Sequence, residues 1–101
     1  MATHKISVTV DSDAIRVDPE TLVMPSSDEV HWAGTTSRAF SIVFENDGPF
    51  GKRELAHADA TTKQRPRTKG RFKYTVISAE NDQIQLDPVI IVEEPPTGPT
   101  P

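Results

Sequence analysis

The sequence predicts an all-β sandwich, and three observations lead to this class. Apolar and polar residues alternate over several short runs, which is typical of strands with one buried face and one exposed face. These runs are rich in β-branched and aromatic residues, which fit a pleated surface. Residues that favour turns separate the runs, as in a sandwich of many short strands. The length of 101 residues suits one domain with one modest core.

About seven strands are expected along the chain. One run, Val89–Val92, is continuously apolar, which predicts a strand that is buried on both faces or lies between two sheets. Another short apolar run, Leu22–Met24, follows the Asp18-Pro19 turn. The alternating runs predict strands over 6–10, 15–17, 30–32, 40–44 and 72–76.

Two segments depart from this pattern. Residues 52–60 are rich in helix formers and lack strand alternation, so we expect one short helical turn in a long connection. Residues 93–101 contain four prolines and no large apolar residue, so we expect a disordered, proline-rich tail. The predicted organisation is therefore a sandwich domain over 1–92 and a tail over 93–101.

Composition excludes several classes of protein. The chain has no Cys, which rules out disulfides, a thiolate nucleophile, an iron–sulfur cluster and a Cys-based zinc site. No apolar run is long enough for a secretory signal or a membrane-spanning helix. We therefore expect a cytoplasmic protein, with a periplasmic location as the alternative if a leader has been removed. The formal net charge of −4 counts against nucleic acid as a partner.

The order of these runs resembles the cupredoxin family. The residues from Ile15 to Trp32 resemble the family's opening, in which a strand, a proline and a second strand lead to a V-x-W pattern. The segment 37–44 resembles the strand that follows, Gly70–Val76 resembles the G-x-Y-x-Y-x-C strand, and 87–92 resembles the closing strand. The resemblance covers residues 6–92 and implies a Greek-key sandwich.

The same resemblance implies that the family's copper site is missing. A blue-copper centre needs two imidazoles, a thiolate and a weak axial ligand. Phe40 stands where the family has its first His, Val76 or one of its neighbours stands at the thiolate position, and no His or Met follows Val76. We therefore expect no metal and no cofactor, and no electron transfer through type 1 copper. A weak metal site or an enzyme centred on His57 and Asp59 stays a distant alternative, because no local ligand motif accompanies them.

Enzymatic activity is not expected. The sequence has neither the Gly-x-Ser-x-Gly elbow of a serine hydrolase nor a glycine-rich phosphate loop. A short chain also leaves little room for a deep pocket.

Charge is distributed unevenly along the chain. Residues 52–73 hold eight basic and two acidic residues, a net of +6, whereas the rest holds three basic and 13 acidic residues, a net of −10. Six of the basic residues occupy odd positions, so in an extended conformation they would point the same way while Phe72 and Tyr74 point inward. These six residues form the predicted basic ribbon: Lys63, Arg65, Arg67, Lys69, Arg71 and Lys73.

Three interpretations of the basic ribbon remain open. Its charges could be a solvated face that opposes edge-to-edge aggregation. They could bind a protein partner with an acidic patch, or an acidic segment of a second copy of the chain. They could bind a polyanion, either nucleic acid or anionic lipid, although no exposed aromatic residues are interleaved for base stacking. We favour a non-catalytic, metal-free binding or structural domain with a protein partner, and keep polyanion binding as the alternative.

Two aromatic residues require separate interpretation. Trp32 is the only Trp and is expected in the core. Phe50, between Pro49 and Gly51, lies in a loop without an alternation partner, so it could either close one end of the sandwich or be an exposed anchor. We include Phe50 with the basic ribbon as a candidate contact for a partner.

Overall fold

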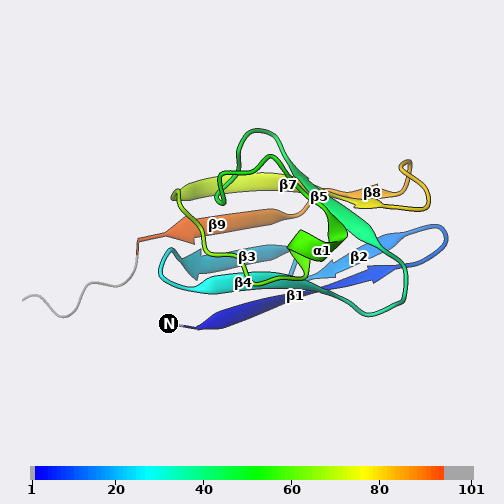
Figure 1. The fold of residues 1–101 in the computed structure, drawn as a ribbon, viewed down its shortest axis with the longest axis horizontal. Helices are drawn as coiled ribbons and strands as arrows, with labels where there is room; N and C mark the ends of the chain where they lie inside the picture. The colour runs from blue at the N-terminus through cyan, green and yellow to red at the C-terminus, as the bar shows by residue number, and fades with distance from the viewer. Residues whose placement is uncertain (1, 95–101) are drawn as a thin grey trace, which may run out of the picture.

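The computed structural model describes residues 2–94, and over this range the all-β prediction is confirmed. Two sheets pack face to face, with one short helix beside them (Figure 1). The strands are β1 Thr3–Val10, β2 Ile15–Asp18, β3 Thr21–Pro25, β4 Glu29–Gly34, β5 Phe40–Phe44, β6 Glu54–Leu55, β7 Gly70–Ser78, β8 Gln85–Leu86 and β9 Val89–Glu93, and the helix is α1 His57–Ala60.

The smaller sheet has the order β2-β1-β4. Its central strand, β1, runs antiparallel to β2 and parallel to β4. The alternation predicted for this strand is observed, because Ile6, Val8 and Val10 are buried and the residues between them are half-buried. Each apolar side chain of β1 therefore faces the larger sheet.

The larger sheet has the order β3-β9-β7-β5-β6, and β8 also pairs with β7. β3 is parallel to β9, and the other neighbouring strands are antiparallel. Two of the neighbouring pairs, β3 with β9 and β5 with β7, are distant in the sequence, as in a Greek-key connection. In β9, Ile90 and Val92 face the core, and Val89 and Ile91 lie on the outer face. The run is continuously apolar because side chains on the outer face of β9 are covered as well: Val89, on that face, is only 8% exposed.

Aromatic side chains fill the space between the sheets. Trp32 and Tyr74 meet edge to face with ring centroids 5.5 Å apart, and the Trp32 indole N–H donates a hydrogen bond of 3.2 Å to the Tyr74 hydroxyl. Phe44 packs beside Tyr74. Burial raises the pKa of Tyr74 to about 12, so the hydroxyl stays protonated at neutral pH. The Trp32 N–H and the Tyr74 hydroxyl therefore satisfy one another inside the core.

The connection over 52–60 contains the expected helical turn, but only its second half is helical. Glu54 and Leu55 form β6, which pairs with Val43 and Ile42 of β5. The helix α1 begins at His57 and ends at Ala60. Four residues is the greatest helix length in the described part of the chain, far short of the roughly 20 residues that cross a membrane.

The division into a sandwich domain over 1–92 and a tail over 93–101 stays a prediction. Glu93 is the last residue of β9, and Glu94 forms an ion pair with Lys69. The remainder of the predicted tail, 95–101, lies outside the described residues.

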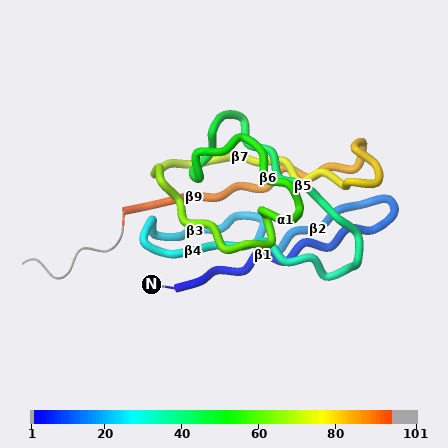
Figure 2. The backbone as a smooth tube through the Cα atoms, in the orientation of Figure 1, coloured from blue at the N-terminus to red at the C-terminus, as the bar shows by residue number. Residues whose placement is uncertain are grey.

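The two long sides of the sandwich are covered differently. On one side, α1 contacts β4, β5 and β6, and Gln64 forms a bridge with Val30 of β4. On the other side, β2 is the last strand of the smaller sheet and β3 is the last strand of the larger one, and the chain passes directly between them (Figure 2). Within residues 2–94, no strand pairs with the outer edge of either β2 or β3.

Candidate functional site

The six residues of the basic ribbon are all exposed, but they do not share one face. Strand geometry begins only at Gly70, and the chain bends at Arg67 and Thr68. The alternation of exposed and buried residues is lost at this bend. In an extended chain Thr68 and Gly70 would face inward, but both are exposed. The prediction of six side chains in phase is therefore wrong over this bend.

The first two residues of the basic ribbon lie beside the smaller sheet. Between them, the main chain of Gln64 exchanges two hydrogen bonds with Val30 of β4, at 2.7 and 2.9 Å. The Arg65 guanidinium lies 4.0 Å from the Glu29 carboxylate at the start of β4. Lys63 and Arg65 therefore flank the edge of β4.

The middle pair lies where the chain crosses from one sheet to the other. The Arg67 main-chain N–H donates to the Pro49 carbonyl, which ties this bend to the loop after β5. Lys69 forms an ion pair with Glu94, and this hydrogen bond holds the pKa of the Glu94 carboxyl below its usual value. Lys69 is thus already engaged by an acidic group of the same chain.

The last pair, Arg71 and Lys73, lies on the outer face of the larger sheet. Tyr74 and Val76 of the same strand are buried, so the odd-numbered positions face away from the core. Across β9, Arg71 is opposite Ile91 and Lys73 is opposite Val89. Neither cation has an ion-pair partner among residues 2–94.

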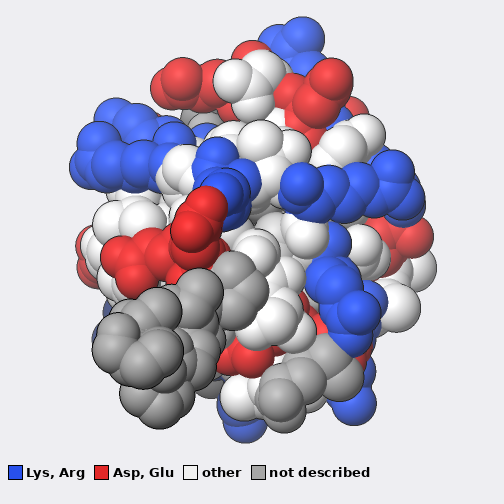
Figure 3. All heavy atoms as spheres, turned by 90° about the vertical axis from the view of Figure 1, so that its left-hand side faces the viewer, with Lys and Arg blue, Asp and Glu red and all other residues white. Residues whose placement is uncertain are grey.

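The position of β7 also corrects one interpretation of its charges. β7 pairs with β5 on one side and with β9 on the other, so it is a central strand. Protection of an exposed sheet edge cannot be the role of Arg71 and Lys73. Figure 3 views the end of the sandwich at which β9 ends, and shows Lys and Arg side chains spread around acidic ones.

Phe50 is part of the core, which corrects its prediction as an exposed anchor. Its side chain is 3% exposed, and its ring meets Trp32 edge to face at 6.0 Å and Phe44 at 5.8 Å. The turn before it allows this position, because Gly48 adopts φ of +59° and its Cα lies against the Phe44 ring, where a Cβ would be only 2.6 Å from the ring. Phe50 therefore closes one end of the aromatic core.

The end of the sandwich at which the cupredoxin resemblance would put copper is filled with hydrocarbon. Phe40 and Val76 are 1% and 0% exposed, and both contribute to the core. The His57 ring packs edge to face on Phe40 at 4.8 Å, and its Nδ1 accepts a hydrogen bond from the Phe40 main-chain N–H at 3.3 Å. Type 1 copper needs two imidazoles and a thiolate, so the residues present do not fit it.

The described residues hold no other cluster of metal ligands. Among residues 2–94, no three His, Asp or Glu side chains lie close enough together to hold an ion. His57 directs Nδ1 at the main chain of β5, and the hydrogen bond at Asp59 is made by its carbonyl to the Gln64 side chain. The structure does not bring His57 and Asp59 together as a ligand pair.

Comparison with known proteins agrees with this fold. A pseudoazurin from Sinorhizobium is similar over 94% of this chain and 76% of its own, with a TM-score of 0.61 and 16% identity. A reduced amicyanin variant covers 87% and 81%, with a TM-score of 0.53 and 15% identity. A copper(I) amicyanin variant covers 88% and 82%, with a TM-score of 0.52 and 15% identity. The sequence matches no protein-family model and no curated protein.

The chain therefore has the cupredoxin-like fold and lacks the copper ligands of that fold. This confirms the resemblance inferred from the order of the strands. Sequence reasoning did not single out Val23 and Ile91, which are opposite one another on the outer face of the larger sheet. The only available signal was that 22–24 and 89–92 are continuously apolar, so that alternate residues must leave the core.

Proposed function

We propose that this domain is a non-catalytic binding domain whose partner is a protein with an acidic surface. The contact is centred on Arg71 and Lys73. The observation that carries the proposal is their position on the outer face of the larger sheet without an ion-pair partner among residues 2–94.

The surroundings of the two cations support a protein partner. Their cross-strand neighbours are Ile91, which is half-buried, and Val89. Aliphatic side chains beside long basic ones favour an interface that buries apolar area while a guanidinium pairs with a carboxylate. Protein interfaces commonly combine these two elements, and Arg is enriched in them.

The rest of the basic ribbon supports this choice over a polyanion. Arg65 lies near Glu29 and Lys69 is paired with Glu94, so two of the six cations already have carboxylate neighbours. Affinity for a polyanion depends on the number of phosphates neutralised, and the chain as a whole is negatively charged. Polyanion binding through the same residues is the alternative.

The test is a double charge reversal, Arg71→Glu with Lys73→Glu. A matched control, Lys52→Glu with Arg53→Glu, changes the formal charge by the same amount in the loop before β6. Both variants and the wild-type protein are immobilised, and proteins retained from the source-cell lysate are quantified by mass spectrometry. We expect the Arg71/Lys73 variant to lose specific acidic partners that the control retains.

A heparin column separates the alternative. Retention of the wild-type protein at low salt, with a salt slope that falls in the Arg71/Lys73 variant, would favour the polyanion. Partner lists that are identical for all three proteins would remove the proposed surface.

A further inference from the structure

The outer edge of β3 carries main-chain groups that no other strand within residues 2–94 pairs with. The Glu20 carbonyl accepts from Val89 and the Ser26 N–H donates to Glu93, both at 2.8 Å, so even-numbered residues of this stretch direct their main chain toward β9. Because direction alternates along a strand, Thr21 and Val23 direct their N–H and carbonyl groups the other way. Among residues 2–94, no strand pairs with these two donors and two acceptors.

The side chain at this edge is also unusual. Val23 is 50% exposed and is the one large hydrophobic residue that is exposed in the described part of the chain. Pro25 ends the available edge, since it has no N–H and its carbonyl accepts from the Asp28 main chain at 3.1 Å. A free edge of this kind is the surface that an added strand pairs with.

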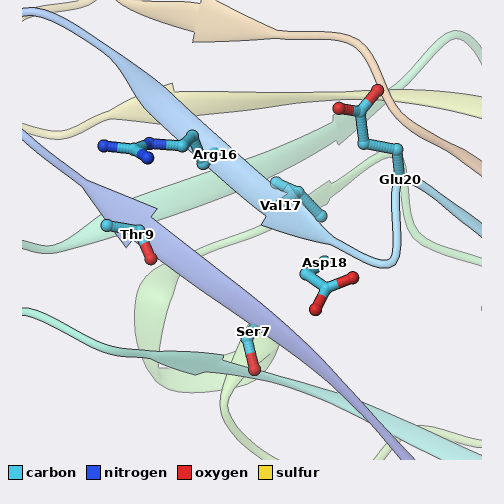
Figure 4. A pocket seen from close by; sticks show the side chains of 6 residues that line it. All are labelled: Ser7, Thr9, Arg16, Val17, Asp18 and Glu20. Atoms are coloured by element: carbon cyan, nitrogen blue, oxygen red, sulfur yellow. The ribbon is translucent and has the colours of Figure 1, made fainter.

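Two hollows lie near the two ends of β3, one against its last residues and one at the turn before it, and both contain carboxylates. One, of about 480 Å³, is lined by Val23, Met24, Pro25, Glu93 and Glu94. The other, of about 230 Å³, lies over β1 and β2 (Figure 4), where Asp18 and Glu20 stand at the turn that leads into β3. Its lining residues are Ser7, Thr9, Arg16, Val17, Asp18 and Glu20.

Three of these carboxylates are unpaired. Within residues 2–94, no ion-pair partner is found for Asp18, Glu20 or Glu93. Glu94, by contrast, is paired with Lys69. The one cation that lines the second hollow is Arg16, and its guanidinium lies 3.5 Å from the Asp11 carboxylate. An occupant of the edge would therefore meet unpaired negative charge at both of its ends.

From these observations, we infer that the β3 edge binds an extended, basic segment of a partner protein by strand addition. The segment pairs its main chain with Thr21 and Val23. Side chains on its outer face contact Val23 and reach the Glu93 carboxylate, and a side chain at the end beside Thr21 contacts the Glu20 carboxylate. The five residues of β3 span roughly 17 Å, which limits the paired segment to about five residues. The site lies on the same sheet as Arg71 and Lys73, with β9 between β3 and β7, and requires the opposite charge in its partner.

The probe is a capped peptide of alternating lysine and valine, titrated into the full chain labelled with ¹⁵N. We expect chemical-shift changes along β3 and slowed hydrogen exchange of the Thr21 and Val23 amides. A peptide of alternating glutamate and valine should not bind, because of its charge. A lysine–valine peptide that is N-methylated at every residue should not bind either, because it lacks the pairing N–H groups.

The variant Val23→Lys tests the edge directly. The variant should leave β3 intact, because the Val23 side chain is 50% exposed. It places a cation where the basic segment would bind, so the Kd of the lysine–valine peptide should rise about tenfold. Thr3→Lys adds the same charge at the exposed start of β1 and should leave Kd unchanged. Absence of binding at millimolar peptide would overturn the inference. Shifts without protection of Thr21 and Val23, or equal effects of the two variants, would overturn it as well.

Discussion

The two faces of β7 have opposite environments. On the inner face, Tyr74 and Val76 are buried. The Tyr74 ring packs edge to face on Trp32, and its hydroxyl accepts a hydrogen bond from the Trp32 indole. On the outer face, Arg71 and Lys73 are exposed and have no ion-pair partner among residues 2–94. One strand thus contributes to folding through one set of side chains and presents unpaired charge through the other. Substitutions on the two faces should therefore separate stability from binding.

Core packing also occupies the positions that correspond to a copper site. At the positions where the sequence resemblance would put copper ligands, Phe40 and Val76 belong to the core, and His57 packs on Phe40. Nδ1 of His57 accepts a hydrogen bond from the Phe40 main-chain N–H. The fold is retained by hydrocarbon packing at positions where a metal centre would need nitrogen and sulfur.

The largest effect is expected in the centre of the core. Trp32→Ala should lower the free energy of unfolding by about 4–5 kcal/mol, because it removes a fully buried indole and leaves a cavity beside Tyr74 and Phe50. Urea denaturation followed by circular dichroism measures the change. A loss below about 1 kcal/mol would show that the aromatic cluster does not hold the sheets together.

Phe50 should behave as a core residue rather than as a binding residue. Phe50→Ala is expected to cost about 3 kcal/mol of unfolding free energy, since the ring packs against Trp32 and Phe44. Phe50→Leu keeps most of the volume and should cost less. If Phe50→Ala kept full stability but lost partners in the pull-down, the anchor interpretation would be restored.

A smaller effect should follow from the hydroxyl that links the two central rings. Tyr74→Phe leaves the Trp32 N–H buried without its acceptor, which should cost about 1–2 kcal/mol. In the double variant Trp32→Phe/Tyr74→Phe both polar groups are gone, so its cost should be less than the sum of the two single variants. Additive costs in this double-mutant cycle would argue that the hydrogen bond contributes nothing.

Asp28 should give the molecule an acid-sensitive contribution to stability. The Ala2 main-chain N–H and the His4 side chain bond to this carboxylate, at 2.9 and 2.8 Å, and hold its pKa below the usual 3.8. Because the folded pKa is the lower one, the contribution is present above pH 3.8 and is lost as the pH falls through the folded pKa. Denaturation curves across this range should be less pH-dependent for Asp28→Asn, and equal slopes would contradict the assignment.

Local pattern predicted the parts of this fold that depend on local chemistry. Alternation located the inward residues of β1 and β5, because burial of one face imposes a period of two. It could not predict that β7 is central or that β3 is an edge, since strand order depends on contacts between distant segments. It also treated 63–73 as one extended piece, whereas the bond from Arg67 to the Pro49 carbonyl bends the chain.

The central claim is that the outer face of β7 binds a partner while its inner face holds the fold. The most direct measurement is made on the Arg71→Glu/Lys73→Glu protein, with unfolding free energy and partner retention determined on the same preparation. We predict an unfolding free energy within about 0.5 kcal/mol of the wild-type value, as is usual for exposed positions, together with loss of the acidic partners. Unchanged retention of those partners in a folded variant would contradict the account.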